Sequence, residues 1–413
     1  MDTSSNGQRS GTGSRQAVKK KQSRLPASVL FMLGSRRSIR EIAVKKGVGT
    51  PVVQLKGVNK RFDKVVAVEK MDLDIEEGSL VSLLGPSGCG KTTILRMIAG
   101  LETPSEGDIF IKGQRVNDIP IHKRKLGMIF QNYALFPHKT IFDNVAFGLK
   151  YRNIPKEQIK KKVMQVLEMV RLPGVENRMP SQLSGGQQQR IAMARAIVIE
   201  PVVLLMDEPL SALDANLREE MRREIDNIQK MIGVTTIFVT HDQREALSMS
   251  DKIIVMKQGL LQQEGSPEEV YNYPANHFVA DFLGHSNFFD GVVIGREGEN
   301  FRVKVGDGNE ILVHHPGAWQ EGDQVELVIR AQSYEVFEKG KNEQKSNMNC
   351  FDGTIIDRSY MGGEVSYFVE LENKTVIHAI DIAKLRPLQR GQKVWIQVKP
   401  NYCGLLPKEN SQA

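Results

Sequence analysis

A glycine-rich octapeptide, GPSGCGKT at residues 85–92, contains the residues best suited to chemistry in this sequence. Its pattern G-x-x-x-x-G-K-T lets the backbone curl so that successive amides face the oxygens of a bound phosphate. Lys91 adds a positive charge for the β- and γ-phosphates, and Thr92 adds a hydroxyl that can bind Mg²⁺. A strand-like run precedes the pattern and a helical run follows it, as such a loop requires. The sequence therefore predicts a nucleoside triphosphate site.

Two acidic residues and a histidine follow other apolar runs that have the length of buried strands. Asp207 ends the run VVLLMD, where an unpaired carboxylate would be costly, so a metal ion is its natural partner. Glu208 is placed to orient or deprotonate a water, and His241 directly follows the run TTIFVT. Ligands of parallel α/β sheets bind at the carboxyl ends of strands, so we expect these residues to meet Gly85 at one edge. The plainer alternatives are helix-capping carboxylates and a structural histidine.

The string LSGGQQQR at 183–190 predicts a second helix end that can bind an anion. Ser184 can cap the following helix, and Gly185 and Gly186 expose its first amides. The first loop already surrounds one triphosphate. A second phosphate-facing helix in the same chain therefore makes sense if it serves a nucleotide bound elsewhere. An ordinary serine-capped helix is the alternative.

Strand and helix patterns alternate through the central part of the chain, which indicates right-handed crossovers and a parallel sheet. The segments VVQLKGV and VEKMDLDI, which come earlier, alternate as antiparallel strands do. Continuous apolar runs predict strands buried on both faces, at 79–85, 202–207 and 235–240. Helices are expected at about 92–101, 187–199 and 215–231. Residues from about 136 to 185 are more polar and mostly helical in pattern.

The pattern changes after about residue 285 to short alternating segments with frequent glycines, which predicts a small β domain. This region contains a weak internal repeat. FDGVV (289–293) recurs as FDGTI (351–355), and VELVIRA (325–331) is echoed by VWIQVKP (394–400). The repeat predicts two similar halves that form a small barrel.

The net charge of +7 is concentrated in the first 50 residues. This segment holds eleven Lys and Arg residues against Asp2 and Glu41, a net charge of +9, so the remaining chain carries −2. The folded part therefore gives no electrostatic reason to expect nucleic-acid binding. The basic segment is expected to be poorly ordered or weakly helical. One alternative is that the segment contacts anionic partners such as a membrane surface. Another is that the start codon is misassigned.

The three cysteines, Cys89, Cys350 and Cys403, favour a reducing compartment, because their number is odd and they lack metal-ligand spacing. Cys89 lies near Lys91 and a predicted helix N-terminus, which should lower the pKa of its thiol; an inert packed thiol is the alternative. No apolar run approaches the roughly 20 residues that cross a bilayer. The nearest run, at 25–33, resembles a short signal-peptide core, but a site that needs cytosolic ATP argues against secretion.

Taken in this order, the motifs closely resemble those of ATP-binding subunits of ABC transporters. The resemblance is strong over about 52–285 and moderate over 288–405. It implies an α/β fold, a P-loop NTPase with a RecA-like core, an antiparallel β subdomain and a helical subdomain, followed by an all-β, OB-like (TOBE) domain. The expected domains are a basic extension (1–50), an ABC ATP-binding domain (51–285, with its helical subdomain at about 136–190) and an OB-like regulatory domain (286–413).

The resemblance also implies a role for each motif residue. The implied catalytic residues are Glu208, His241, Lys91 and Gln131, and the implied Mg²⁺ ligands are Thr92, Gln131 and Asp207. The implied nucleotide-binding residues are Phe62, Gly85, Pro86, Ser87, Gly88, Cys89, Gly90, Lys91, Thr92, Thr93, Ser184, Gly185, Gly186, Gln187 and Asp214. Among them, Phe62 would stack on adenine, with core packing as its alternative. The string from Ser184 to Gln187 would close on the ATP of a partner chain.

The segment 133–149 resembles the surface on which importers receive a helix of the membrane subunit. Exposed side chains of Tyr133, Leu135 and Phe136 would form an apolar socket there, with burial inside the subdomain as the alternative. The segment 271–284 resembles the linker helix of importers for polyamines, iron, sulfate, maltose and glycerol phosphate.

The implied function is ATP hydrolysis by a translocase of the EC 7.6.2 class, with ATP and Mg²⁺ as cofactors. A homodimer, or a pair of ATP-binding subunits, would drive solute uptake through two integral membrane permease subunits, with an extracytoplasmic solute-binding protein involved indirectly. We expect a peripheral location on the cytoplasmic face of the inner membrane and no nucleic-acid partner. The strings around the first loop and at 130–149 most resemble the polyamine (spermidine/putrescine) branch. Iron, sulfate, sugar and glycerol phosphate are the alternative cargoes.

Two other functions compete with this one. A soluble ABC-type ATPase could act on RNA or ribosomes through the basic extension and the OB-like domain, but the chain has one cassette and no heptad repeats. An exporter subunit is disfavoured by the C-terminal β domain.

Overall fold

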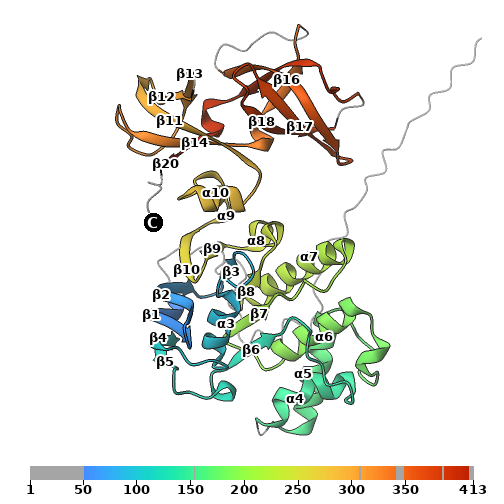
Figure 1. Ribbon diagram of the computed structural model, residues 1–413. Helices are drawn as coiled ribbons and strands as arrows, with labels where there is room; N and C mark the ends of the chain where they lie inside the picture. Colours follow the sequence, from blue (N-terminus) through green and yellow to red (C-terminus); the bar gives the residue numbers. More distant parts are fainter. Residues whose placement is uncertain (1–50, 153, 307, 341–347, 384–385, 409–413) are drawn as a thin grey trace, which may run out of the picture. The chain divides into compact units, whose positions relative to one another are not determined.

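The computed structural model describes residues 51–408, apart from 153, 307, 341–347 and 384–385 (Figure 1). The predicted basic extension, residues 1–50, lies outside the described residues. The described chain forms four β-sheets, two before and two after residue 285. None of the described helices is long and apolar enough to cross a membrane.

The larger sheet of the N-terminal part is built from the continuous apolar runs. Its strands are β3 (Leu80–Leu84), β6 (Leu126–Ile129), β7 (Val203–Asp207), β8 (Thr235–Thr240), β9 (Lys252–Lys257) and β10 (Leu260–Gly265). They lie in the order β10-β9-β3-β8-β7-β6. All pairs are parallel except β10 with β9. Every residue of β3, β7 and β8 is buried, as expected for strands covered on both faces, so the predicted parallel sheet is confirmed.

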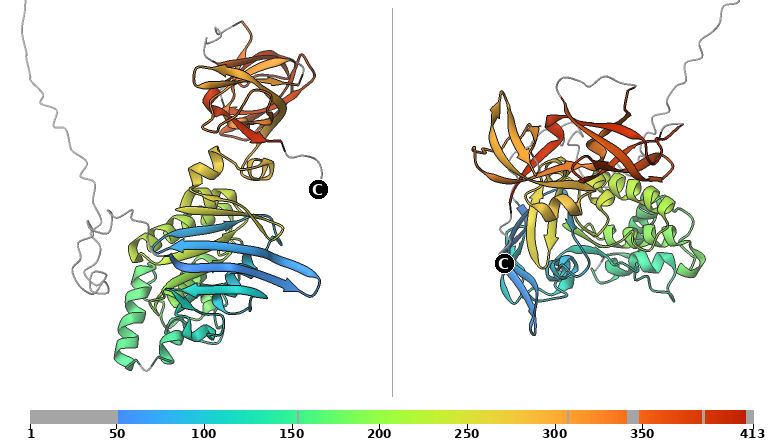
Figure 2. Two further views of the ribbon diagram at one scale, coloured as in Figure 1. Left: turned by 90° about the vertical axis from the view of Figure 1, so that its left-hand side faces the viewer. Right: turned by 45° about the horizontal axis from the view of Figure 1, so that its top comes forward.

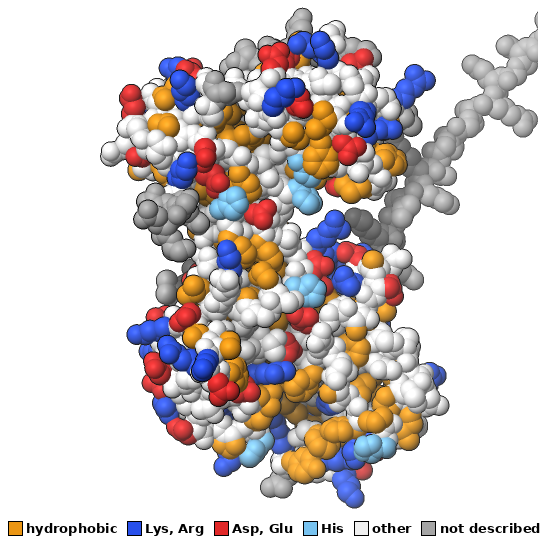
Figure 3. Space-filling view, viewed as in Figure 1, with side chains coloured by type: hydrophobic (Ala, Val, Ile, Leu, Met, Phe, Trp, Pro, Cys, Tyr) orange, Lys and Arg blue, Asp and Glu red, His pale blue; other side chains and the backbone are white. Residues whose placement is uncertain are grey.

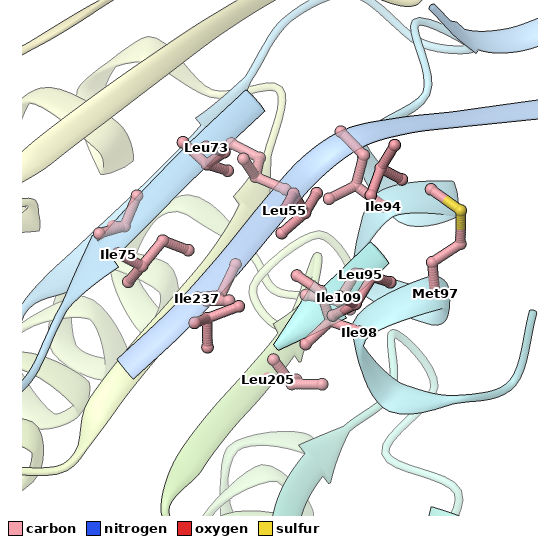
Figure 4. Packing of buried hydrophobic residues seen from close by; sticks show 14 of the residues in the cluster. Leu55, Leu73, Ile75, Ile94, Leu95, Met97, Ile98, Ile109, Leu205 and Ile237 are labelled. Carbon is pink, nitrogen blue, oxygen red and sulfur yellow. The ribbon is translucent and has the colours of Figure 1, made fainter. Parts of the chain in front are cut away.

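A second, antiparallel sheet packs on one helix of this core. Its strands are β1 (Pro51–Phe62), β2 (Val65–Glu76), β4 (Glu106–Ile111) and β5 (Gln114–Arg115), in the order β2-β1-β4-β5. The helix α3 (Lys91–Ala99) shares one hydrophobic core with both sheets. Figure 4 shows Leu95 and Ile98 of α3 clustered with Leu55 of β1, Ile109 of β4 and Leu205 of β7. The helix is therefore held from two sides, which fixes the loop before it.

The remaining helices, with the exception of α5, begin at capping side chains that the sequence supplies. They are α4 (Ile141–Lys150), α5 (Lys156–Met169), α6 (Gly185–Ile197), α7 (Ala215–Ile232), α8 (Gln243–Met249), α9 (Pro267–Asn272) and α10 (His277–Phe282). The 3₁₀ turn η1 (Ile121–Lys123) lies between β5 and β6, and η2 (Pro180–Gln182) lies between α5 and α6. The helices α4, α6, α7, α8, α9 and α10 have side-chain caps from Thr140, Ser184, Asp214, Asp242, Ser266 and Asn276. Each of these side chains accepts a hydrogen bond from an amide of the first turn.

The C-terminal part contains two five-stranded antiparallel sheets (Figure 2). The first contains β11 (Ser286–Glu297), β12 (Asn300–Val305), β13 (Asn309–Val313), β14 (Gln324–Arg330) and β20 (Cys403–Pro407). The second contains β15 (Glu335–Glu338), β16 (Asn349–Tyr360), β17 (Glu364–Leu371), β18 (Val376–Ile382) and β19 (Lys393–Val398). The turns η3 (Ala331–Ser333) and η4 (Pro400–Tyr402) follow β14 and β19. One hydrophobic core contains residues of both sheets.

The predicted internal repeat is present in the topology of these sheets. The sheet orders, β13-β12-β11-β14-β20 and β18-β17-β16-β19-β15, correspond strand for strand. The repeated FDG strings lie in the central strands β11 and β16, and the second repeated pair begins in β14 and β19. In chain order, the first half runs from β11 to β15 and the second half from β16 to β20. The last strand of each half joins the sheet of the other half, so β15 pairs with β19 and β20 pairs with β14. Within the described residues, the halves are two open sheets around one core and not a single closed barrel.

The glycines of the repeated FDG strings let the central strands approach their neighbours closely. A Cβ added at Gly353 would lie 2.5 Å from Cγ1 of Val369 and 3.0 Å from the carbonyl oxygen of Glu370. At Gly363, in the following turn, an added Cβ would meet no atom within 4 Å.

We expect Gly353→Ala to lower the free energy of unfolding by about 1–3 kcal/mol, because the added methyl group overpacks a filled core. Gly363→Ala is the matched control and should stay within about 0.5 kcal/mol of wild type. Urea unfolding followed by tryptophan fluorescence measures the difference, since both tryptophans, Trp319 and Trp395, lie in the C-terminal part. Equal stability of the two variants would show that the FDG strand can move to accept a side chain.

Candidate nucleotide site

The loop between β3 and α3 passes close to other backbone segments at its two ends. A Cβ at Gly85 would lie 2.3 Å from the carbonyl oxygen of Met256, and one at Gly90 would lie 2.4 Å from that of Ala67. Gly90 also has a φ of +100°, in the left-handed region that favours glycine. At Gly88 an added Cβ would meet nothing within 4 Å. The outer glycines are therefore required by packing, while Gly88 lies in the open middle of the loop.

Lys91, the first residue of α3, folds its ammonium group back into this loop. Its Nζ donates to the carbonyl oxygens of Gly85 at 2.7 Å and Pro86 at 2.8 Å. The side chain is 4% exposed, so the charge lies inside the loop and not in solvent. Ser87 is exposed and Thr93 is half-buried. A positive charge and the N-terminus of α3 thus occupy the same concave segment, which suits a bound phosphate.

Thr92 and Asp207 join the start of α3 to the end of β7. The hydroxyl of Thr92 donates to Oδ1 of Asp207 at 2.8 Å. Asp207 is buried, and burial raises the pKa of its carboxyl, against the opposing effects of the Thr92 hydrogen bond and the charges of Arg96 and Lys91. The buried carboxylate of Asp207 and the half-buried hydroxyl of Thr92 have the chemistry of a hard-cation site. Within the described ranges, no cluster of three or more His, Cys, Asp or Glu side chains could hold a metal ion. A hydroxyl and a carboxylate oxygen are ligands of the kind that Mg²⁺ takes, so the pair fits this ion.

Glu208, His241 and Gln131 meet beside Asp207. Oε2 of Glu208 lies 3.4 Å from Nδ1 of His241 and 3.4 Å from Nε2 of Gln131. Gln131 also donates to the hydroxyl of Ser211 at 3.3 Å. Glu208 has a φ of +43°, and its amide donates to the carbonyl of Val239 in β8 at 3.1 Å. A non-glycine residue held in this region indicates a conformation that its neighbours impose. Glu208 and His241, which were predicted to meet at one sheet edge, do so, and Gln131 lies with them.

The string at 183–190 forms the N-terminus of α6, as predicted. The hydroxyl of Ser184 accepts from the amide of Gln187, and the side-chain oxygen of Gln187 accepts from the amide of Ser184 at 3.0 Å. This reciprocal capping holds the helix end rigid. Ser184 and Gly185 are exposed, while Gly186 is buried, with an added Cβ 3.0 Å from a methyl carbon of Leu217 in α7. The helix end therefore presents Ser184 and Gly185 to solvent.

Two further predicted residues lie on the surface. Oδ1 of Asp214 accepts from the amide of Leu217 at 3.0 Å and caps α7. Phe62, at the end of β1, is 43% exposed, and the ammonium of Lys60 lies 4.6 Å from its ring centroid. The alternative of core packing is therefore wrong for Phe62. Its ring is available to stack on a flat group.

The expectation of an activated thiol at Cys89 is wrong. The residue is buried, and burial raises the pKa of its thiol more than the nearby charge of Lys91 lowers it. The Sγ atom lies 3.7 Å from Nζ of Lys91. A Cβ at Gly85 would lie only 2.8 Å from the same sulfur. The thiol is therefore packed into the floor of the loop.

The segment expected to form an exposed socket is only partly exposed. Tyr133 is buried at 7% exposure, whereas Leu135 and Phe136 are half-buried, which corrects the expectation for Tyr133. The ring of Phe136 lies 4.6 Å from that of Phe147, which in turn contacts the exposed Tyr151. Figure 3 shows hydrophobic side chains gathered over the part of the surface formed by α4. An apolar surface exists here, built from α4 as well as from the loop.

Arg195 of α6 holds this segment, and the sequence patterns did not single it out. Its guanidinium donates to the carbonyl oxygens of Tyr133 and Ala134, both at 2.8 Å. These two residues have positive φ values of +60° and +45°. Burial lowers the pKa of Arg195. A basic residue inside the otherwise apolar string IAMARAI is the signal that could have revealed it.

Comparison with known proteins assigns these features to a family. A model of the ABC transporter family matches residues 68–211, and a model of the TOBE domain matches residues 338–406. A spermidine/putrescine import ATP-binding protein of Vibrio cholerae serotype O1 is 46% identical over 336 residues, which cover 81% of this chain and 88% of that protein. The chain belongs to the ATP-binding subunits of ABC transporters.

Other relatives agree with this assignment. A spermidine/putrescine import ATP-binding protein of Rubrobacter xylanophilus is 43% identical over 363 residues, covering 87% of this chain and 94% of that protein. The solved structure of cbiO1 from Clostridium perfringens, part of the ABC transporter complex cbiONQ, is 29% identical with a TM-score of 0.51. It covers 53% of this chain and 90% of that chain. The predicted family, the P-loop α/β fold class with its TOBE domain and the ATPase class are thereby confirmed.

The packing of Cys89 makes a testable prediction about thiol reactivity. We expect iodoacetamide at pH 8 to label the half-buried Cys350 first, and Cys89 and Cys403 only slowly. Burial raises the pKa of all three thiols, that of Cys403 to about 12. Fewer thiolates are therefore present below the ordinary thiol pKa of about 8.5 than in an unfolded chain, and the labelling of Cys89 should keep accelerating above that pH. Mass spectrometry of timed digests, with urea-unfolded protein as the control, measures the three rates. Labelling of Cys89 at the unfolded rate at pH 7 would contradict its packing.

Proposed function

We propose that this chain hydrolyses ATP bound with Mg²⁺ at the carboxyl edge of the parallel sheet. The observation that carries the proposal is the 2.8 Å hydrogen bond between Thr92 and Asp207. Thr92 and Asp207 would hold Mg²⁺, with Gln131 as a further oxygen ligand. When bound, the ion would neutralise charge on the phosphates. The loop from Gly85 to Thr93 would surround the phosphates, and Lys91 would neutralise charge on the γ-phosphate.

Glu208 is proposed as the group that orients and deprotonates the attacking water. It directly follows the Mg²⁺-directed Asp207, and its carboxylate lies within 3.4 Å of both His241 and Gln131. His241 would contact the γ-phosphate and hold Glu208 in place. Gln131 would position the water from the other side. Phosphoryl transfer depends mainly on such positioning and on charge stabilisation. Phe62 would stack on the adenine ring.

We further propose that two ATP-binding subunits complete each site together. The exposed, rigid N-terminus of α6, with Ser184, Gly185, Gly186 and Gln187, is a second phosphate-binding helix end in the same chain. In a head-to-tail pair it would close on the ATP held by the partner's loop, with Asp214 at the same contact. A two-fold pair of this kind closes at two subunits. ATP would thereby stabilise the contact, and hydrolysis would release it.

The proposed pair drives solute import through separate membrane permease subunits. The apolar surface around Phe136, Phe147 and Tyr151 is the proposed contact for those subunits. The relatives named as spermidine/putrescine import proteins support a polyamine as the cargo. We place the chain at the cytoplasmic face of the membrane as a peripheral subunit. Residues 51–285 are proposed as the ATP-binding domain and 286–413 as an OB-like regulatory domain.

We expect Glu208→Gln to bind ATP with unchanged affinity and to hydrolyse it about 10²–10⁴-fold more slowly, because the amide cannot accept the proton of the water. A fluorescent ATP analogue measures binding, and release of inorganic phosphate measures turnover. Glu77→Gln is the matched control, since Glu77 is exposed and, within the part of the chain that the structure describes, its ion pair is with Lys112 at the surface. Turnover of Glu208→Gln equal to that of the control would refute the role of Glu208.

A further inference from the structure

Arg218, in the first turn of α7, lies between two loops of the candidate site. Its Nη2 donates to the carbonyl oxygen of Leu213 at 2.9 Å, directly before Asp214. On its other side, Nη1 lies 3.7 Å from Oδ2 of Asp242, and Nε lies 3.9 Å from Oε1 of Glu245. One guanidinium thus contacts the loop before α7 and the acidic groups that follow His241.

Those acidic groups hold the backbone on both sides of His241. The hydroxyl of Thr240, the residue before His241, donates to Oε2 of Glu245 at 2.5 Å. The same hydroxyl accepts from the amide of Asp242, the residue after His241, at 3.0 Å. Oδ1 of Asp242 accepts from the amide of Glu245 at 3.2 Å and caps α8. The peptide that carries His241 is therefore fixed by side chains that Arg218 contacts.

Glu245 needs a compensating charge because it is buried, with 5% exposure. Burial raises the pKa of its carboxyl and the hydrogen bond from Thr240 lowers it, while the negative charge of Asp242 raises the pKa further and the positive charge of Arg218 opposes this. A buried carboxylate that loses its cationic neighbour is strongly disfavoured. Without Arg218, the carboxyl of Glu245 would take up a proton or move toward water. Either change would alter its hydrogen bond with Thr240.

A second basic residue strengthens the same contact between helices. Arg222 lies one turn after Arg218 on α7, and its Nη1 donates to the carbonyl oxygen of Arg244 in α8 at 3.3 Å. Residues four apart lie on the same face of a helix. The face of α7 that carries both arginines is therefore directed at the start of α8, where the His241 loop ends.

We propose that Arg218 is a positioning residue that sets His241 against Glu208 and couples this geometry to the loop at Asp214. The inference rests on the proposed function, in which Asp214 meets a second subunit and His241 contacts the γ-phosphate. When the two subunits of the proposed dimer come together at Asp214, the carbonyl group of Leu213 shifts, and Arg218 transmits that shift to Glu245 and Thr240. Arg218 itself contacts neither ATP nor the attacking water.

The test compares purified full-length variants of two arginines on the same helix. Arg218→Met is expected to lower kcat for ATP about 3- to 30-fold, the range for coupling residues that touch neither ligand, with KM for ATP unchanged, when each variant is assayed well below its thermal unfolding midpoint. Arg223→Met is the control, because Arg223 is 71% exposed and pairs only with Glu219 of its own helix among the described contacts. Arg218→Lys, which keeps the charge, should recover part of the lost kcat.

A double-mutant cycle separates positioning from general destabilisation. Glu245→Gln keeps an acceptor for Thr240 and removes the charge that faces Arg218, so it should also lower kcat. It serves as the test variant if Arg218→Met fails to fold. The double variant, Arg218→Met with Glu245→Gln, should lose no more kcat than the worse single variant, since the two side chains act as one unit. If Arg218→Met does not fold, the double variant is made with Arg218→Lys instead. Additive losses would overturn the inference.

The outcomes for the two proposals differ. If the wild-type chain hydrolyses ATP and Arg218→Met matches Arg223→Met in kcat, the inference about Arg218 is overturned and the proposed function stands. If the wild-type chain binds ATP but never hydrolyses it, the proposed function is overturned, and the inference with it.

Discussion

The structure depends on one constraint: three neighbouring parallel strands end at the same edge of one sheet. β3 pairs with β8, and β8 pairs with β7, in a register that sets Leu84 beside Thr240 and Asp207 beside Val239. The residues that follow these strand ends, Gly85, Glu208 and His241, must therefore converge. The hydrogen bond from Thr92 to Asp207 joins the start of α3 to the same edge. The core on both sides of α3 then holds the loop against the sheet.

The chain has a second helix end suited to a phosphate, and the proposed pair of subunits gives that helix end a nucleotide to contact. The N-terminus of α6 is held rigid by reciprocal capping and is exposed to solvent. The same helix carries Arg195, which holds the apolar segment at Tyr133 and Ala134. A group bound at one end of α6 can therefore affect the surface proposed for membrane subunits. On the other side of the site, Arg218 connects α7 to the His241 loop in a similar way.

Much of the ATP-binding region could be predicted because its signals are local. Continuous apolar runs located β3, β7 and β8, and the strand ends then located Asp207, Glu208 and His241. The errors came from properties that depend on packing. The pKa of Cys89 is decided by burial and not by its charged neighbour. Tyr133 is buried, and its backbone carbonyl is held by Arg195, a residue distant in sequence, so the local pattern around Tyr133 did not indicate this packing. The pairing of β15 and β20 with the sheet of the opposite half was not predictable, because the alternation of apolar and polar residues does not specify which sheet edge a short strand joins.

The central claim is that each ATP site combines the Lys91 loop of one chain with the Ser184 helix end of another. Turnover per chain, measured against protein concentration together with light scattering, tests it most directly. The account predicts that turnover per chain rises with concentration, in step with the appearance of dimers in ATP and Mg²⁺, and that Ser184→Arg abolishes both. Constant turnover per chain from a protein that stays monomeric with ATP bound would show that one chain contains the whole site, and would contradict the account.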